Sequence, residues 1–235
     1  MKQFALEHQA SAHKVGTDGV LLGAYAAEYF AKEPPRAVLD VGTGSGLIAL
    51  MLAQAFTDCH VTGIDIDAPS AQEASLNAAR SPFASRISIL EGDFTQLPTP
   101  KSPYDLIISN PPYFTESHFA EDARKTQAKH IGALTPDDIF EHSVSLLAPT
   151  TGRVMLILPP STWDGFAKAA SQYGYSVEHK LEVSTRAETP PKRLITLWSR
   201  DKVTSPTLSR LTLLAGSGRH DYTPEYQSLL ASYLL

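Results

Sequence analysis

Residues 37–53 read Ala-Val-Leu-Asp-Val-Gly-Thr-Gly-Ser-Gly-Leu-Ile-Ala-Leu-Met-Leu-Ala. Ala37–Val41 is a short apolar run typical of a buried strand, and glycines follow at once at positions 42, 44 and 46. Leu47–Ala53 then predicts a helix that begins in the glycine loop. In this geometry, backbone amides and a helix N-terminus approach a bound cofactor. The segment therefore predicts an α/β fold with a cofactor site at the first strand–helix turn.

The spacing of the glycines limits the kind of cofactor. A dinucleotide-binding loop has glycines at relative positions one, three and six, whereas here they fall at one, three and five, and Leu47 takes the sixth place. A Gly-Lys-Ser/Thr sequence does not follow, which excludes a nucleotide phosphate loop. Asp40 directly precedes the glycines and would repel a pyrophosphate. The loop therefore favours a cationic or zwitterionic cofactor.

Two acids follow the apolar part of the second predicted strand, His60–Asp65. Asp65 lies about 20 residues past the loop, the spacing at which a carboxylate binds ribose hydroxyls. Asp67 fits the N-cap of the helix predicted over 68–80, which has Pro69 in its first turn. Asp65 is therefore the candidate ligand and Asp67 the structural acid.

A third predicted strand, Arg86–Leu90, is followed closely by Asp93 and Phe94. The Asp93 carboxylate is placed to accept a hydrogen bond from an adenine amine, and Phe94 would then flank the adenine ring. The alternative interpretation is an acid in a solvated loop.

The fourth predicted strand, Tyr104–Ser109, ends abruptly in Asn110-Pro111-Pro112-Tyr113. Prolines fix φ and cannot donate, so the backbone carbonyl of Pro111 can accept a hydrogen bond beside the side-chain carbonyl of Asn110. Two acceptors and the Tyr113 ring suit a flat group that carries an NH2. The alternative is a strand terminator with a loop tyrosine.

Composition excludes several classes of protein. A chain of 235 residues can bury a core without covalent cross-links, and its only cysteine, Cys59, excludes internal disulfides and thiolate metal clusters. No charged-then-apolar leader opens the chain and no apolar run reaches membrane-spanning length, so we expect a cytoplasmic protein. The formal charge of −5 argues against an indiscriminate nucleic-acid binder.

The remaining pattern completes an alternating α/β chain. A helix is predicted over Val20–Phe30, with Thr17 or Asp18 as its N-cap. From spacing alone, capping is the favoured role of Asp18. The other predicted elements are a helix over Pro136–Leu147, a strand over Gly152–Leu158, a helix over Trp163–Tyr173, an antiparallel strand pair over Tyr175–Val183 and Arg193–Trp198, and an amphipathic helix within Leu208–Leu235.

Together these motifs resemble the class I S-adenosylmethionine-dependent methyltransferases that modify amino groups. More narrowly, the chain resembles the bacterial N6-methyltransferases that act on adenine 37 of a valine tRNA. The residues that carry the narrower likeness are His13–Gly23, Leu47–Gln54, Asn77, Ser81-Pro82, Ser109–Phe114, Tyr222–Tyr226 and Tyr233-Leu234. The resemblance implies a Rossmann-like sheet of seven strands, with helices on both faces and an antiparallel C-terminal hairpin.

The resemblance implies S-adenosylmethionine as the cofactor. The glycine loop would lie against its methionine part with Asp40 near the ammonium, Asp65 would hold the ribose, and Asp93 the adenine N6. The cofactor-binding residues would be Asp18, Asp40, Gly42, Thr43, Gly44, Gly46, Asp65, Ile66, Asp93, Phe94 and Asn110.

It also implies that Asn110, Pro111, Pro112 and Tyr113 form the catalytic motif. Asn110 and the Pro111 carbonyl would accept hydrogen bonds from both N–H groups of the substrate amine. Tyr113 would stack on a base extruded from the tRNA loop. Catalysis would then come from positioning and electrostatics, so we expect no metal, no covalent intermediate and no separate general base.

A protein that binds tRNA needs basic residues to contact its phosphates. We predict that the residues in this role are Lys14, Arg124, Lys125, Lys129, Arg186, Lys192 and Arg193. The alternative for this set is a solvated charged surface. Phe114–His130 has no net formal charge and is expected to lie over the active site. We expect a monomer or a weak dimer.

We expect one domain over 1–235, with an N-terminal covering segment (1–36), a catalytic core (37–200) and a C-terminal extension (201–235). A release-factor glutamine N5-methyltransferase shares the motif Asn110-Pro111-Pro112-Tyr113, here called the clamp. Such enzymes carry a larger domain before the glycine loop, where this chain has only 39 residues before Asp40. Ribosomal guanine N2- and DNA adenine methyltransferases are further enzymatic alternatives. An inactive cofactor-binding partner subunit is the alternative outside enzymes.

Overall fold

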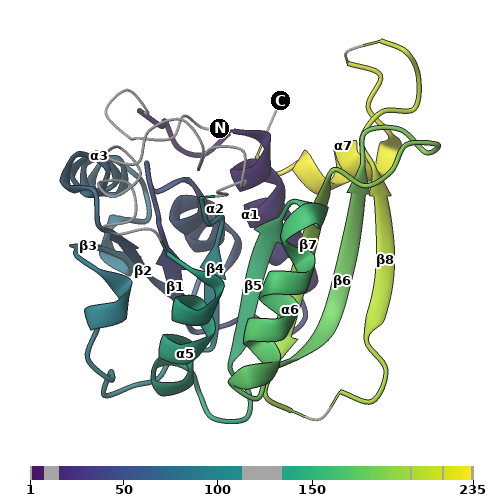
Figure 1. Ribbon diagram of the computed structural model, residues 1–235. Helices are drawn as coiled ribbons and strands as arrows, with labels where there is room; N and C mark the ends of the chain where they lie inside the picture. The colour runs from purple at the N-terminus through teal and green to yellow at the C-terminus, as the bar shows by residue number, and fades with distance from the viewer. Residues whose placement is uncertain (1, 8–15, 113–133, 202, 219, 234–235) are drawn as a thin grey trace, which may run out of the picture.

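The computed structural model describes residues 2–7, 16–112, 134–201, 203–218 and 220–233. Within these ranges, one mixed sheet runs through the molecule in the order β3-β2-β1-β4-β5-β7-β6-β8 (Figure 1). Its strands are β1 (Ala37–Val41), β2 (His60–Asp65), β3 (Ile87–Glu91), β4 (Leu106–Ser109), β5 (Arg153–Leu158), β6 (Ser176–Ser184), β7 (Arg193–Ser199) and β8 (Thr207–Thr212).

The helices pack on both faces of this sheet, as the sequence predicts (Figure 1). They are α1 (Thr17–Tyr29), α2 (Leu47–Ala55), α3 (Ala68–Ala79), α5 (Pro136–Leu146), α6 (Trp163–Gln172) and α7 (Pro224–Leu230), with short 3-10 turns η1 (Ala84–Arg86), η2 (Phe94–Gln96) and η4 (Pro160–Thr162).

Alternation along the strands divides the core into two layers. In β4, Leu106 and Ile108 pack with α1, α2 and α7, whereas Ile107 packs with α5 and α6 on the other face. Successive side chains of a strand point to opposite faces, so a continuous apolar run marks a strand that is covered on both sides. All three residues are fully buried.

The sheet has one strand more than predicted. The antiparallel pair of β6 and β7 is confirmed, but β8 joins the far side of β6 as a parallel edge strand. The family resemblance implied seven strands, and no strand was expected over residues 207–212, where the structure buries only Leu211. Pairing with β6, rather than burial, makes this segment a strand.

The start of α1 also corrects the sequence-based expectation. Gly16 is the N-cap and makes no side-chain capping bond, while Thr17 and Asp18 are already helical. The Asp18 carboxylate is engaged elsewhere, since its Oδ2 accepts a hydrogen bond from Nε of Arg193. It therefore does not act as a cap.

The N-terminal segment Lys2–Glu7 lies against the helical layer that contains α1. Lys2 bonds through its amide to the Tyr233 carbonyl (3.1 Å) and through Nζ to the Ala231 carbonyl (2.7 Å), so the two ends of the described chain lie together (Figure 1). Phe4 is buried and meets the Phe83 ring edge-on. The segment is thus fixed to the core at several points.

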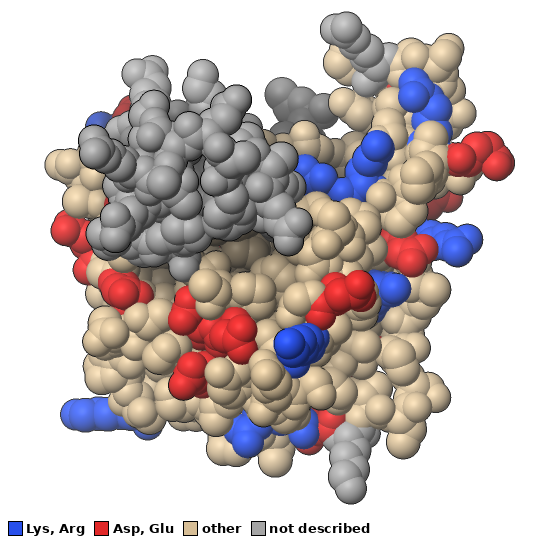
Figure 2. All heavy atoms as spheres, in the orientation of Figure 1, with Lys and Arg blue, Asp and Glu red and all other residues tan. Residues whose placement is uncertain are grey.

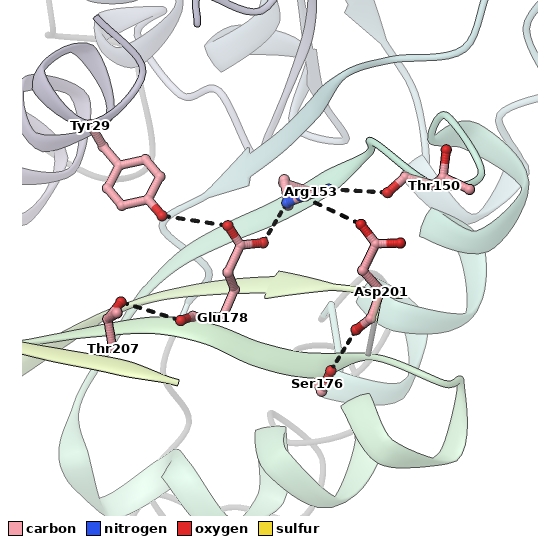
Figure 3. Close-up of polar contacts among 7 residues, drawn as sticks. All are labelled: Tyr29, Thr150, Arg153, Ser176, Glu178, Asp201 and Thr207. Atoms are coloured by element: carbon pink, nitrogen blue, oxygen red, sulfur yellow. Dashed lines mark hydrogen bonds and ion pairs between the residues drawn. The ribbon is translucent and has the colours of Figure 1, made fainter. Parts of the chain in front are cut away.

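An ion-pair cluster closes the opposite end of the sheet, where β5 and β6 begin. Figure 3 shows Arg153 between the carboxylates of Glu178 and Asp201, and Tyr29 reaching Glu178 from α1. Thr207 of β8 donates to the Glu178 carbonyl (3.3 Å). These contacts tie β5, β6, β8 and α1 together away from the glycine loop.

Among the described residues, no helix is long and apolar enough to cross a membrane.

Candidate active site

The candidate site lies at the carboxyl ends of the parallel strands β1, β2, β3 and β4. Val41 pairs with Ile64 on one side and with Ser109 on the other, and Asp65 pairs with Glu91. The loops that follow these strands therefore start side by side at one edge of the sheet, the usual ligand edge of an open α/β fold. Oγ of Ser109 donates to the Val41 carbonyl (2.7 Å) and links the clamp strand to the glycine-loop strand.

The glycine loop has a backbone that only glycine adopts readily. Gly42, Gly44 and Gly46 have φ of 69°, 56° and 80°, and Gly46 is the N-cap of α2. The amides of Gly42 and Thr43 both bond to the Ile64 carbonyl (2.9 and 3.0 Å). Apart from the glycine and its two chain neighbours, no heavy atom of the described residues lies within 4 Å of where a Cβ would stand at Gly42 or Gly44. The loop therefore leaves open space beside its backbone.

Asp40 is fully buried beneath this loop. Its Oδ2 accepts hydrogen bonds from Oγ1 of Thr43 (2.6 Å) and the amide of Ala49 (3.2 Å), whereas its Oδ1 is buried without a partner among described residues. Burial raises the pKa of Asp40 to about 7; the bonds from Thr43 and Ala49 oppose the rise, and the Asp65 carboxylate adds to it. A buried carboxylate oxygen without a donor is ready for a cationic ligand.

Of the two acids after β2, the structure confirms the predicted role of Asp67. Asp67 caps α3 by accepting from the Ser70 amide (3.0 Å), which confirms its role. Asp65 accepts from the Gly44 amide (2.8 Å) through Oδ2 and from the Asp67 amide (2.9 Å) through Oδ1. It therefore holds the glycine loop, and its contact with a ribose stays a prediction. The next residue, Ile66, is an apolar side chain left 51% exposed.

The residues after β3 have structural contacts of their own. Asp93 caps η2, and its Oδ1 accepts from the amide and the hydroxyl of Thr95 (2.9 and 2.8 Å). Phe94 is buried in the core and meets His142 edge-on at 6.0 Å. Contact of Asp93 and Phe94 with an adenine ring stays a prediction.

The clamp begins where β4 ends. Asn110 is half-buried, Pro111 is buried and Pro112 is exposed. Their position directly after Ser109 puts the Asn110 side chain and the Pro111 carbonyl at the same sheet edge as the glycine loop. Tyr113 lies outside the described residues, as do Lys14, Arg124, Lys125 and Lys129.

Three predicted RNA-binding residues are described, around the β6–β7 connection. Arg186 bonds through Nε to the Gly216 carbonyl (3.1 Å), Lys192 is exposed, and Arg193 pairs with Asp18. Figure 2 shows Lys and Arg side chains gathered at the upper edge over this connection and the loop after β8. The structure thus brings Asp18 and Arg193 together, although the sequence predicts different roles for them.

Sequence reasoning assigned no role to Asn77, which was part of the family likeness. The structure buries it on α3, where its Nδ2 donates to the Ser45 carbonyl in the glycine loop (2.9 Å). The available signal was a polar amide in the alanine-rich helix Ala68–Ala79.

Among the described residues, no group of three or more His, Cys, Asp or Glu side chains is placed to hold a metal ion.

Comparison with known proteins agrees with this geometry. Residues 38–137 match the family model described as a methyltransferase domain. The chain has the fold of a predicted O-methyltransferase from Agrobacterium tumefaciens, with a TM-score of 0.68, 18% identity, and coverage of 91% of this chain and 95% of that one.

Curated relatives match along the whole chain. The tRNA1(Val) (adenine(37)-N6)-methyltransferase of Parabacteroides distasonis is 40% identical over 235 residues, covering 100% of this chain and 96% of the relative. The protein of the same name from Porphyromonas gingivalis is also 40% identical, with coverage of 97% and 91%. Identity at this level over nearly the full length of both proteins shows common membership, and the chain therefore belongs to the family of tRNA1(Val) (adenine(37)-N6)-methyltransferases.

Proposed function

We propose that this protein transfers a methyl group from S-adenosylmethionine to the exocyclic N6 of adenine 37 in tRNA1(Val). The observation that carries the proposal is the pairing of β1 with β4, which starts the Gly42–Gly46 loop and the Asn110-Pro111-Pro112 clamp side by side. One loop fits a cofactor and the other fits an amino group. The names of the full-length relatives support the base and the tRNA.

The described residues fit S-adenosylmethionine. Among the described residues, Oδ1 of Asp40 is a buried acceptor without a partner and suits the ammonium. The open space beside Gly42 and Gly44 in the same part of the chain admits the methionine part. Asp65 suits the ribose, and the exposed Ile66 suits one face of the adenine. Thr43, Gly46, Asp18, Asp93, Phe94 and Asn110 complete the proposed cofactor site. When bound, S-adenosylmethionine supplies an electrophilic methyl group on a sulfonium.

The chemistry required of the protein is to position a weak nucleophile. The lone pair of an adenine amine is delocalised into the ring, so the nitrogen attacks poorly when it is planar. The side-chain carbonyl of Asn110 and the backbone carbonyl of Pro111 each accept a hydrogen bond from one N–H group of the amine. These two hydrogen bonds favour a pyramidal nitrogen. Pro112 stiffens the loop and Tyr113 stacks on the base. Fixing the geometry in this way would lower the barrier without a general base. As the N–C bond forms the S–C bond breaks, so the products are the methylated amine and S-adenosylhomocysteine, and the proton that the nitrogen then loses passes to water.

Recognition of tRNA then needs an extruded base and a basic surface. Adenine 37 leaves the stack of its loop to reach the clamp, while Lys14, Arg124, Lys125, Lys129, Arg186, Lys192 and Arg193 contact phosphates. In this scheme residues 37–200 form the catalytic core of a single domain, 1–36 cover the site and 201–235 extend it. The enzyme works in the cytoplasm as a monomer or weak dimer and uses no metal.

The test is methyl transfer from labelled S-adenosylmethionine to RNA from cells that lack this protein, followed by digestion to nucleosides. Label in N6-methyladenosine of the tRNA fraction, lost when tRNA1(Val) has guanine at position 37, is the expected result. Label in N2-methylguanosine would overturn the base assignment. Label only in release-factor glutamine would overturn the RNA substrate.

A further inference from the structure

Asn77 joins the glycine loop to the N-terminal segment. Its side chain is 2% exposed and makes three hydrogen bonds. Nδ2 donates to the carbonyls of Ser45 (2.9 Å) and Glu7 (2.7 Å), and Oδ1 accepts from the Glu7 amide (2.9 Å). Both amide N–H bonds and the carbonyl are therefore used in one buried contact between three parts of the chain.

The Ser45–Gly46 peptide is held at both of its polar ends. The Ser45 carbonyl points to Asn77, and the Gly46 amide donates to the Thr43 carbonyl (2.9 Å). This peptide leads into Gly46, the residue with φ of 80° that begins α2. If the Asn77 amide were absent, the Ser45 carbonyl would lose the partner that fixes its direction. The peptide would then be freer to rotate and change the shape of the loop.

The same face of α3 also sets how closely the loop approaches. A Cβ at Gly46 would lie 3.3 Å from Cβ of Ala74, so the backbone of the loop rests on this alanine. Ala74 and Asn77 are three residues apart and therefore share one face of the helix. Ala74 sets the distance between α3 and the loop, and Asn77 sets the direction of the Ser45 carbonyl.

The N-terminal segment keeps Asn77 in place in turn. Glu7 offers both its amide and its carbonyl to Asn77, which fixes the orientation of the side-chain amide. Arg80, the C-cap residue of α3 three positions after Asn77, forms an ion pair with the Glu7 carboxylate at the surface. Lys2 and Phe4 anchor the start of the segment. Asn77 thus connects the position of Lys2–Glu7 to the glycine loop.

We propose that Asn77 is a positioning residue for S-adenosylmethionine, holding the glycine loop in its cofactor-binding shape through Ser45 and coupling that shape to the segment Lys2–Glu7. The inference rests on the proposed function for the identity of the cofactor. It goes further by giving a role to residues that do not touch the cofactor themselves. Asn77 acts through the loop, so its effect should fall on cofactor binding rather than on turnover or RNA binding.

The test compares Asn77→Ala with Gln72→Ala, which removes an exposed amide from the same helix but leaves the Asn77 contacts. Calorimetric titration of S-adenosylmethionine into each protein without RNA should give about a tenfold higher Kd for Asn77→Ala, equivalent to about 1.4 kcal/mol. The control should stay within about twofold of the unsubstituted protein. In methylation assays, the KM for S-adenosylmethionine should rise while kcat and the KM for tRNA stay unchanged. A general loss of folding would lower the active fraction without this split.

Asn77→Asp separates the contacts further, because it keeps an acceptor for the Glu7 amide but loses both donors. We expect it to bind S-adenosylmethionine as weakly as Asn77→Ala does. Unchanged cofactor affinity in either variant would overturn the inference. Binding is measured without RNA, so that outcome is distinct from a failure to methylate tRNA.

Hydrogen exchange of the unsubstituted protein gives a test that does not depend on how the variants fold. If the loop and the segment are coupled, saturating S-adenosylmethionine should slow exchange at the Glu7 amide, because each site stabilises the other. Equal exchange rates at Glu7 with and without S-adenosylmethionine would overturn the coupling.

Discussion

Nε of Arg193 at the start of β7 lies 2.7 Å from Oδ2 of Asp18 in the first turn of α1. Asp18 is predicted to contact the cofactor and Arg193 to contact RNA phosphates. Their ion pair therefore links the predicted cofactor site to the predicted RNA-binding residues. Nη1 of Arg193 also donates to the Lys192 carbonyl (2.7 Å), which keeps the end of the β6–β7 connection close to this pair. A change in the position of α1 would therefore reach the basic surface directly.

We expect this pair to make a modest, measurable contribution to stability. The side chains of Arg193 and Asp18 are 34% and 24% exposed, and partly exposed pairs contribute about 0.5–1 kcal/mol. A double-mutant cycle with Asp18→Asn and Arg193→Gln, followed by urea unfolding, should give a coupling energy of about that size. The pair of Arg210 and Glu182, with Arg210 79% exposed, is the control and should give almost none. Strict additivity at Asp18 and Arg193 would contradict the prediction.

Asn110→Ala should lower kcat by about 100-fold or more, the usual cost of losing a hydrogen-bonding group that acts on the reacting atoms. The Kd for S-adenosylmethionine should change far less than kcat, because Asn110 acts on the substrate amine and most of the proposed cofactor contacts come from other residues. Single-turnover methylation and calorimetry measure the two effects separately. Gln96→Ala, on the exposed surface of η2, is the control. Equal losses in kcat and cofactor affinity would remove Asn110 from its assigned role.

Gly44→Ala should weaken the glycine loop even though the added methyl group has room. Its φ of 56° is unfavourable for alanine by about 1–2 kcal/mol, and its amide is bonded to Asp65. We expect a lower melting temperature and weaker S-adenosylmethionine binding. Gly92→Ala is the matched control, since it is also uncrowded but lacks a positive φ. The prediction fails if the two variants behave alike.

The buried Asp40 should make stability depend on pH. Burial raises its pKa to about 7 in the folded protein, against about 4 in an unfolded chain. The neutral form therefore stabilises the fold fully below about pH 4, and this contribution is lost as the pH rises to about 7. Relative to Asp40→Asn, the unsubstituted protein should lose unfolding free energy over that interval. Urea titrations at several pH values measure the difference, with Asp58→Asn, at an exposed acid, as the control for loss of one carboxylate.

The pH dependence of cofactor binding should run in the opposite direction. If Oδ1 of Asp40 faces the ammonium of S-adenosylmethionine, binding favours the carboxylate form, so affinity should rise between about pH 6 and 8. Asp40→Asn should flatten this rise. An unchanged pH profile of the Kd in Asp40→Asn would place the ammonium elsewhere.

Salt dependence tests the basic residues of the β6–β7 connection. Each phosphate contact that is lost should reduce the slope of log K against log salt concentration for tRNA binding by about 0.7–0.9. We expect a reduction of this size for Lys192→Gln and for Arg186→Gln. Arg210→Gln on the edge strand β8 is the control. An unchanged slope in both test variants would exclude this surface from the RNA interface.

The sequence predicts the parts of the fold that depend on local patterns. Apolar runs mark β1, β4 and β5, broken in β1 only by Asp40, because these strands are covered on both faces. Asp67 is identified as a cap because capping depends on residues a few positions away. The carboxyl ends of parallel strands meet at one edge of a sheet, so the order of motifs along the chain already places Asp65 and Asn110 at the same edge.

Contacts between distant parts of the chain could not be predicted in this way. Asp18 and Arg193 are separated by 175 positions, and nothing in the neighbourhood of either residue indicates the other. The strand β8 forms because β6 offers an unpaired edge, which its own weak pattern does not reveal. Asn77 looks like an ordinary helical residue until Glu7 and Ser45 are seen on either side of its amide.

The attachment of Lys2 to Ala231 and Tyr233 has a consequence for the order in which the parts of the protein fold during synthesis. The segment Lys2–Glu7 is synthesised more than 200 residues before the carbonyls that fasten its beginning. Contacts across so much chain close late, since they require most of the polypeptide to be ordered beforehand. A nascent chain that already contains every glycine and acid of the cofactor site therefore still lacks this anchor. If this anchor supports the glycine loop, full affinity for the methyl donor would be acquired only after residues 231–233 have been made and packed.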